Sequence, residues 1–386
     1  MADPWTRIAT AWFTMFVIGT DLFVGSPLLP LIAADYRVPP GLAGWSVTTF
    51  SLAYMVSAPL LGSVADHIGR RRTLTFSLAA FCAANLLTAS ADNFSWLLTT
   101  RLLAGAAAAG ISPSIYALVG GTAPLDRRAT RLGVVVSGLL MSLVLGAPAG
   151  GLAGASLGWP SVFAIIAGLS LLLVWANGHI WPVDRTEKVV ARPCAPTMAV
   201  LAPRLAPTVA WSTALYGMYT YLGTGLASAG FSTAETASVI VFYGCGAIVG
   251  VLIGGRLADL LGARLTSGIS LAGLCASLFL LRYALNAGTF VDIGFGFTSA
   301  VAQLFFPSQQ AGLANDFPAQ RATVLAWNNS ALFLGISLGS IVGGQAIALG
   351  GFGANLTVSA AIALVGWMIN SAVAPGPARA AVTHRC

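Results

Sequence analysis

The chain has 386 residues, of which 8% are charged and 57% are apolar. A soluble domain carries about 25% charged residues, so this composition excludes a water-soluble globular protein. The 19 basic residues outnumber the 12 acidic ones, but they lie in short loops between apolar runs and form no stripe on a helix, which argues against a nucleic-acid-binding surface.

Twelve apolar runs are long enough to cross a bilayer, which takes about 20 residues for each helix. They predict an all-α polytopic membrane protein with twelve transmembrane helices, the spans 1 to 12. The runs lie near 8–32, 42–64, 73–91, 94–121, 132–155 and 160–181, and in a second set near 206–227, 236–258, 265–284, 288–312, 322–348 and 353–374.

A polar segment separates the two sets of six spans. It holds charged residues and several prolines, so we expect a cytoplasmic linker or a short surface helix. The predicted organisation is an N-terminal six-helix bundle over 1–181, this linker over 182–205, a C-terminal six-helix bundle over 206–374 and a cytoplasmic tail over 375–386.

The basic residues predict the orientation in the membrane. With both termini in the cytoplasm, sixteen basic residues lie inside and only Arg37 and Arg282 lie outside, which is the positive-inside pattern. The first run holds Asp21 in its middle and is too long for a signal sequence, so we interpret it as an uncleaved span. The expected location is the cell (inner or plasma) membrane, with multiple passes.

The chain repeats itself at a fixed offset of 193 residues. Self-similarity of this size predicts two copies of one structural unit. In an apolar chain, two like halves rich in small residues are typical of a transporter whose site lies where the halves meet. The repeated blocks are Gly62, Ala65, Asp66, Gly69 and Arg71 with Gly255, Ala258, Asp259, Gly262 and Arg264; Arg128-Ala129-Thr130 with Arg321-Ala322-Thr323; and Gly146, Gly150 and Gly151 with Gly339, Gly343 and Gly344.

Two ionisable residues lie deep inside the spans of the first half. Asp21 is thirteen residues from the start of its run, and Arg101 lies about seven residues inside span 4. A charge at such depth costs roughly 2.5–3.5 kcal/mol, so we expect each to be paired or to face a water-filled cavity. Their depths differ by roughly 6 Å, which an extended arginine can reach. The alternatives are that Arg101 snorkels to the outer interface and that Asp21 only distorts its helix.

The second half lacks this pair. The counterparts of Asp21 and Arg101 at the fixed offset are Ala214 and Gly294, which points to proton handling in the first half. Asp292 is the only other deep acid and is a secondary candidate for proton coupling. An interfacial position explains Asp292 equally well.

Several polar and aromatic side chains of the second half form a candidate substrate cavity. Tyr216 and Tyr219 lie in span 7, Gln303 in span 10 and Asn328 in span 11. Aromatic residues near the outer end of span 7 fit an interfacial belt equally well.

The loop after span 2 runs from Gly62 to Leu74 and holds three consecutive arginines. Gly62 permits close approach of a neighbouring helix, and Gly69 permits a tight turn. Asp66 can cap or face a helix N-terminus. Basic residues that only set topology would not require Asp66.

Span 5 carries Gly146, Pro148, Gly150 and Gly151. Glycines on one face allow close helix packing, and a proline inside a helix bends it.

These blocks resemble the major facilitator superfamily over essentially the whole chain, specifically its twelve-span drug/proton antiporter branch. The loop matches the signature G-x-L-A-D-R-x-G-R-[KR]-x-x-L except at Val64 and His67. Span 4 resembles the proton-relay motif of that family, with Ala104 where glutamine is usual. Spans 1 and 5 resemble the arabinose-efflux-permease-like subgroup, and Pro148 is shifted by one position from the antiporter signature.

The resemblance implies a major facilitator fold, two pseudo-symmetric six-helix bundles that alternate access to a central site. It implies a conformational latch between the two halves at Asp66 and Arg70, made in one conformation and broken in the other, in a loop that also holds Gly62, Gly69 and Arg71. It also implies proton coupling at Asp21 and Arg101.

The expected function is proton-coupled efflux of a small organic molecule of drug, sugar or nucleoside type. A major facilitator importer or facilitator, and a receptor or scaffold that transports nothing, are the alternatives. We expect the chain to be a monomer whose partners are the substrate, protons and the lipid bilayer, without nucleic acid, cofactor or metal. An enzyme is not expected, because the sequence has no nucleophile elbow, HExxH or phosphate-loop pattern.

Overall fold

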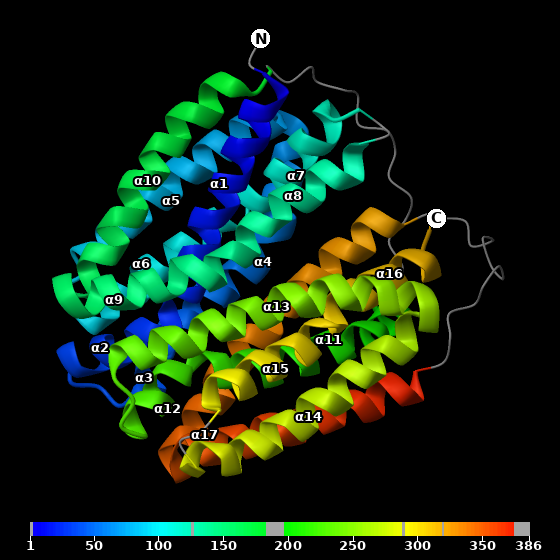
Figure 1. Ribbon diagram of the computed structural model, residues 1–386. Coiled ribbons are helices and arrows are strands. Elements are labelled where there is room, and N and C mark those ends of the chain that lie inside the picture. Colours follow the sequence, from blue (N-terminus) through cyan, green and yellow to red (C-terminus); the bar gives the residue numbers. More distant parts are fainter. Residues whose placement is uncertain (1–2, 125–126, 183–196, 288–289, 319, 374–386) are drawn as a thin grey trace.

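The computed structural model of the chain describes residues 3–124, 127–182, 197–287, 290–318 and 320–373. Every regular element in these ranges is a helix (Figure 1). In chain order the elements are α1 (Pro4–Phe23), α2 (Gly25–Asp35), α3 (Pro40–Ala43), α4 (Trp45–Ile68), α5 (Arg70–Ala89), α6 (Phe94–Ala108), α7 (Ile111–Thr122), α8 (Arg128–Met141), the π-helix η2 (Ser142–Gly146), α9 (Ala147–Leu157), α10 (Trp159–Ile180), α11 (Met198–Thr220), α12 (Leu222–Ser228), α13 (Thr233–Leu261), α14 (Ala263–Ala287), α15 (Val291–Gln303), α16 (Phe305–Asp316) and α17 (Arg321–Ala372).

The helices account for the twelve predicted spans. Seven helical stretches among the described residues are long and apolar enough to cross a bilayer, and α1 with α2 adds an eighth across a bend of 43°. One of the seven, α17, contains two predicted spans, because Gly350 and Gly351 leave helical geometry between them. The three remaining predicted spans are α5, which begins with three arginines, and the interrupted pairs α11–α12 and α15–α16.

Interruptions fall at equivalent places in the two halves. Helices α1 and α2 separate at Val24, and α6 and α7 separate at Ala109 and Gly110. In the second half, α11 and α12 separate at Tyr221, and α15 and α16 at Leu304. The first and fourth spans are therefore interrupted in both halves.

The polar linker is shorter than the sequence predicted. Helix α11 begins at Met198 and includes Pro203, whereas the linker was expected to reach residue 205. The side chain of Arg204 forms an ion pair with Asp316 of α16, so a charge that suggested a loop is accommodated on a helix. The predicted linker residues 183–196 and the tail residues 374–386 lie outside the described residues.

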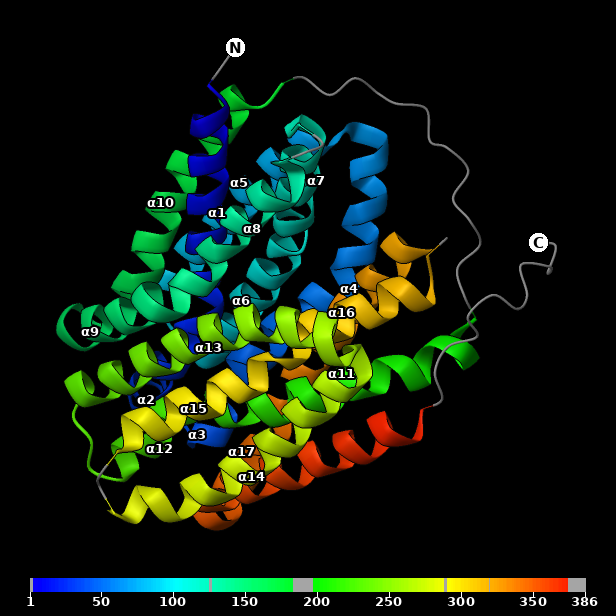
Figure 2. The same cartoon turned by 45° about the vertical axis from the view of Figure 1, so that its right-hand side comes forward.

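Two hydrophobic cores define the two halves. One core is built from residues between 8 and 181, joined by Phe333 and Ile336 of α17. The other is built mainly from α11 to α17, joined by a few residues of α1, α2, α3, η2 and α9. Figures 1 and 2 show these halves as two bundles inclined to each other.

Contacts between the halves gather toward one end of the molecule. The bundles converge around α2, α3 and α12 and separate toward the ends near the two termini (Figure 2). The Ser340 hydroxyl donates to the carbonyl oxygen of Gly44 at 2.7 Å. A Cβ atom on Gly223 would lie 2.4 Å from the carbonyl oxygen of Ser26. The absence of a side chain at Gly223 thus allows the two backbones to meet.

The structure confirms the sequence repeat. Gly69 and Gly262, which correspond at the fixed offset, both have positive φ, +97° and +87°. A Cβ atom on Gly146 would lie 2.1 Å from Thr20 Oγ1, and one on Gly339 would lie 2.6 Å from the carbonyl oxygen of Thr213, the counterpart of Thr20. In both halves, therefore, a glycine at the same repeat position of the fifth span lies against the first span.

Candidate functional site

Asp21 and Arg101 form a buried ion pair between α1 and α6. Arg101 Nη1 donates to Asp21 Oδ1 at 2.9 Å, and Arg101 Nη2 donates to Asp21 Oδ2 at 3.0 Å. This is the bidentate geometry in which a guanidinium matches a carboxylate. Asp21 is 1% exposed and Arg101 is 6% exposed. The pairing that the sequence predicted is present, and its role in proton coupling stays a prediction.

The helix geometry explains the position of each partner. Asp21 lies in the last turn of α1, just before the break at Val24, and Arg101 lies in the middle of α6. The carbonyl groups at a helix C-terminus carry partial negative charge, so the end of α1 also favours a cation. Arg101 therefore points toward a carboxylate and toward the negative end of a helix.

Two aromatic rings enclose the guanidinium. Arg101 Cζ lies 4.7 Å from the ring centroid of Phe50 in α4 and 5.1 Å from that of Phe163 in α10. A cation over an aromatic face is stabilised by the ring quadrupole. The pair thus links four of the six spans of its half.

Gly105 brings α4 close enough for this contact. It lies one turn after Arg101, and a Cβ atom there would be 2.0 Å from the carbonyl oxygen of Phe50. The sequence analysis did not identify Gly105, Phe50 or Phe163 as site residues. The available signal was the spacing of four between Arg101 and Gly105, which places them on one helix face.

The burial of Asp21 and Arg101 decides what this ion pair can do chemically. Breaking a buried ion pair by neutralising one partner costs about 3–5 kcal/mol, because the other charge stays buried without compensation. Loss of the Asp21 charge would therefore release Arg101 from its place. Both side chains are buried, so a solute can reach the carboxylate only after the pair opens.

Asp292 lies in a different environment. It is in the first turn of α15, partly exposed, with its carboxylate 3.5 Å from the Ser238 hydroxyl. Because α15 begins at Val291 and not at residue 288, Asp292 is at a helix end and is not a deep acid. An acid in the first turn stabilises a helix N-terminus, and a proton-coupling role for Asp292 stays a prediction.

Two tyrosines of the predicted substrate cavity are packed inside the second half. Tyr219 is 3% exposed, donates to the carbonyl oxygen of Phe23 at 3.0 Å and stacks on Tyr243 with the ring centroids 5.0 Å apart. Tyr216 is partly buried and makes an edge contact with Trp211. Tyr219 therefore joins the two halves.

The polar members of that predicted cavity are also buried. Gln303 is 7% exposed, and Asn328 is fully buried. Thr208 donates to Asn328 Oδ1 at 2.7 Å, while Asn328 Nδ2 has no hydrogen-bond partner among the described residues. An unpartnered buried donor is costly, so Asn328 keeps capacity for one further hydrogen bond.

The predicted latch residues take separate roles in this conformation. Asp66 forms an ion pair with Arg70, one turn further along the chain, on either side of the tight turn at Gly69. Arg71 donates to the carbonyl oxygen of Gly178 in the last turn of α10. A Cβ atom on Gly62 would meet nothing within 4 Å. The expectation that Gly62 permits close helix approach is therefore wrong for this conformation.

The glycines of span 5 pack closely against another helix, and that helix belongs to span 1, which the sequence did not identify. A Cβ atom on Gly150 would lie 2.3 Å from Val24 Cγ2, and one on Gly151 would lie 2.8 Å from Pro27 Cβ. Before Pro148 the chain forms the π-helix η2, in which the Ala147 amide bonds to the residue five positions earlier. A wide helical turn of this kind therefore precedes Pro148, and such turns are frequent at functional sites.

Comparison with known proteins identifies relatives of the chain. A family model described as Major Facilitator Superfamily matches residues 11–231. The uncharacterized MFS-type transporter YceJ of Bacillus subtilis (strain 168) is 30% identical over 351 residues, which cover 88% of each chain. The chloramphenicol resistance protein of Streptomyces lividans is 29% identical over 250 residues, covering 63% of this chain and 64% of that one.

A solved structure shows the same fold at low sequence identity. The crystal structure of a D-xylose-proton symporter superimposes with a TM-score of 0.79 and 14% identity, covering 97% of this chain and 98% of the other. The chain belongs to the major facilitator superfamily. It is a multi-pass membrane protein and a secondary transporter.

Proposed function

We propose that this transporter exports a small organic molecule from the cytoplasm in exchange for protons, and that it works as a monomer by alternating access. The observation that carries the proposal is the buried, bidentate pair of Asp21 with Arg101. An ionisable pair at this depth in a span is costly and is typical of an ion or proton pathway.

The geometry of the pair supports a proton role. In the described conformation both carboxylate oxygens of Asp21 accept hydrogen bonds from Arg101, which is the bidentate arrangement of a guanidinium with a carboxylate. A proton on Asp21 would replace the attraction by a neutral contact and would free Arg101. Protonated and ionised Asp21 would therefore favour different arrangements of α1 and α6.

The orientation supports export. The positive-inside pattern favours a cytoplasmic location of both termini, so the end at which the bundles separate (Figure 2) would face the cytoplasm. In this reading the inward-facing state has released its proton and holds the Asp21–Arg101 pair. A cytoplasmic solute would bind in this state, and a proton from outside would reset the pair after the solute leaves.

The relatives support a small organic substrate without choosing one. One relative is a chloramphenicol resistance protein, which favours efflux of a drug-like molecule. The structural likeness to a D-xylose-proton symporter rests on 14% identity and supports the fold alone. Symport of a sugar with a proton is the second candidate, since a pair that responds to protons can serve either direction of coupling.

The test is substrate-driven proton movement in proteoliposomes that contain a pH-sensitive dye, screened over antibiotics, sugars and nucleosides. Export by antiport predicts that an inward substrate gradient moves protons out of the vesicles. Protons that enter together with the substrate would establish symport instead. Substrate movement without any proton movement would refute coupling.

A further inference from the structure

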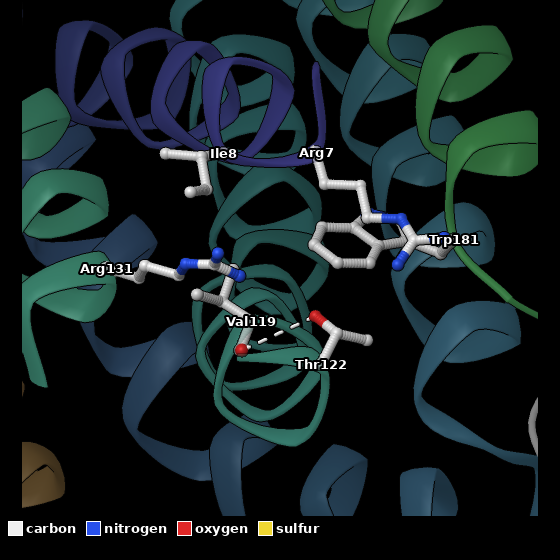
Figure 3. Close-up of a pocket in the computed structure, with 6 residues that line it drawn as sticks. All are labelled: Arg7, Ile8, Val119, Thr122, Arg131 and Trp181. Atoms are coloured by element: carbon white, nitrogen blue, oxygen red, sulfur yellow. Dashed lines mark hydrogen bonds between the residues drawn. The ribbon is translucent and has the colours of Figure 1, made fainter. Parts of the chain in front are cut away.

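A small cavity opens at the end of the first half that carries the N-terminus (Figure 3). Its volume is about 30 Å³, and since one water needs about 10–15 Å³ by this measure, it holds about two water-sized groups. Its walls come from the start of α1, the end of α7, the start of α8 and the residue after α10: Arg7, Ile8, Val119, Thr122, Arg131 and Trp181.

Two guanidinium groups face this cavity from opposite sides. Figure 3 shows Arg7 beside the ring of Trp181 and Arg131 beside Val119, with Thr122 between them. The Thr122 hydroxyl donates to the carbonyl oxygen of Leu118 at 2.8 Å, so its proton is already used within α7. The two arginines are therefore the donors that remain for a bound group.

Neither guanidinium has a counterion in the part of the chain that the structure describes, where Arg7 and Arg131 form no ion pair and no side-chain hydrogen bond. Arg7 Nε is fully buried and lacks a hydrogen-bond partner there. A buried donor on a cation is costly without an acceptor. Two like charges around one cavity also repel each other, so the site favours an anion with several acceptor oxygens.

The position indicates which anion fits. Trp5 lies two residues before Arg7 and is 70% exposed, which is typical of an aromatic side chain at the membrane–water interface. An exposed tryptophan this close to the cavity supports a position at headgroup level. Ile8 and Val119 provide an apolar wall. Arginine binds phosphate oxygens with more than one parallel hydrogen bond.

We propose that Arg7 and Arg131 form a binding site for a phosphate group at the headgroup level of the cytoplasmic leaflet. The partial negative charge at the end of α7 weakens the site by about half a charge, which is less than the two full positive charges that surround it. The group belongs to an anionic phospholipid or to free phosphate. The site is separate from the Asp21–Arg101 pair and does not depend on the direction of transport.

Lipid binding to the purified full-length protein tests the site. Native mass spectrometry is used to titrate the wild type and the double variant Arg7→Gln/Arg131→Gln with phosphatidylglycerol. We expect the double variant to bind at least about tenfold more weakly, because charge-assisted hydrogen bonds are lost. Arg72→Gln is the matched control, since Arg72 is an exposed arginine at the same end of this half, and it should bind as the wild type does.

Two further probes identify the source of the phosphate. Competition by inorganic phosphate supports a site that accepts the free anion, whereas phosphatidylglycerol binding that phosphate does not reduce supports a lipid site. Diacylglycerol, which lacks the phosphate, should bind weakly to every variant. Thermal unfolding and the charge-preserving variant Arg7→Lys/Arg131→Lys distinguish loss of the site from loss of the fold.

Three results would overturn the proposal. The first is equal phosphatidylglycerol affinity of the wild type and the double glutamine variant. The second is equal affinity of the wild type for diacylglycerol and phosphatidylglycerol. The third is a loss of phosphatidylglycerol affinity in Arg72→Gln as large as that in the double glutamine variant, since the effect would then belong to any arginine at this end of the half.

Discussion

Arg71 donates a hydrogen bond to the carbonyl oxygen of Gly178, which ties the start of α5 to the C-terminal end of α10. At the fixed offset of the repeat, Arg264 donates to the carbonyl oxygen of Ser371 at 2.5 Å. A cation at a helix C-terminus satisfies its last carbonyl groups and its partial charge. In each half, therefore, an arginine at the start of the third span caps the C-terminal end of the last span.

The first prediction is that Arg71→Gln destabilises the protein. The loss of a hydrogen bond from a charged donor to a helix end corresponds to about 1 kcal/mol, which lowers the melting temperature by a few degrees. Thermal unfolding in detergent measures the effect, and Arg264→Gln should behave alike. Arg72→Gln serves as the control. Equal melting of the Arg71 and Arg72 variants would contradict the capping role.

The second prediction concerns the buried pair. Asp21→Asn should abolish uphill export but still permit downhill movement, because the proton-sensitive charge is removed. Arg101→Ala should impair both, since it leaves the Asp21 carboxylate buried without a partner. Counterflow and uphill uptake into inverted vesicles separate the two activities.

Stability gives an internal control for this pair. The double variant Asp21→Asn/Arg101→Gln should unfold at a higher temperature than either single variant, because no uncompensated charge stays buried. If Asp21→Asn still concentrates substrate at the wild-type rate, the proton site lies elsewhere, and Asp292 is the first residue to examine.

The third prediction is that Asp66, beside the turn between α4 and α5, acts in the conformational change and not in substrate binding. Asp66→Asn removes the ion pair with Arg70 and should slow transport several-fold while equilibrium substrate binding changes little. Asp259→Asn is the matched control, because Asp259 is the counterpart of Asp66 in the second half. A parallel loss of binding and transport in Asp66→Asn would refute a conformational role.

The fourth prediction tests the close approach beside the pair. Gly105→Ala places a methyl group against the backbone of Phe50, 2.0 Å from its carbonyl oxygen, and overpacking of this kind costs about 1–3 kcal/mol. It should lower both stability and proton coupling, as Phe50 is displaced from Arg101. Gly168→Ala, whose Cβ atom meets nothing within 4 Å, should be silent. Identical behaviour of the two variants would count against the contact.

The fifth prediction is the topology. Single cysteines in a cysteine-free background at Asp3, Val190 and Ala380 should react with a membrane-impermeant thiol reagent only after the cells are opened. These sites test the N-terminus, the linker and the C-terminal tail. Labelling of any one of them in intact cells would reverse or break the proposed orientation.

Sequence patterns predicted the spans because length and hydropathy are local properties. The pairing of Asp21 with Arg101 was also predictable, since a charge at this depth needs a partner and the two depths differ by only roughly 6 Å. The break at Val24 was not predicted, although Gly25, Ser26 and Pro27 follow it directly. Pro27 has no N–H to donate to the carbonyl oxygen of Phe23, and that oxygen accepts a hydrogen bond from Tyr219 instead.

Contacts between spans limited the prediction of the site. Phe50 and Phe163 are ordinary apolar residues in the sequence, and only the fold brings their rings to Arg101. Asp292 was placed too deep because the start of α15 at Val291 has no sharp sequence signal. Gly62 illustrates the opposite error, since a glycine in a motif suggested a close contact where the structure has open space.

The unequal halves have a consequence for how such a chain can diverge. Asp21, Arg101 and both rings that enclose Arg101 belong to the first half, while the second half has Ala214 and Gly294 at the equivalent positions. A substitution in α11 to α17 therefore replaces neither member of the buried pair nor a ring that encloses it. The two copies of the repeat are thus under different constraints, because the first has a buried charge pair to preserve and the second has none at the equivalent positions.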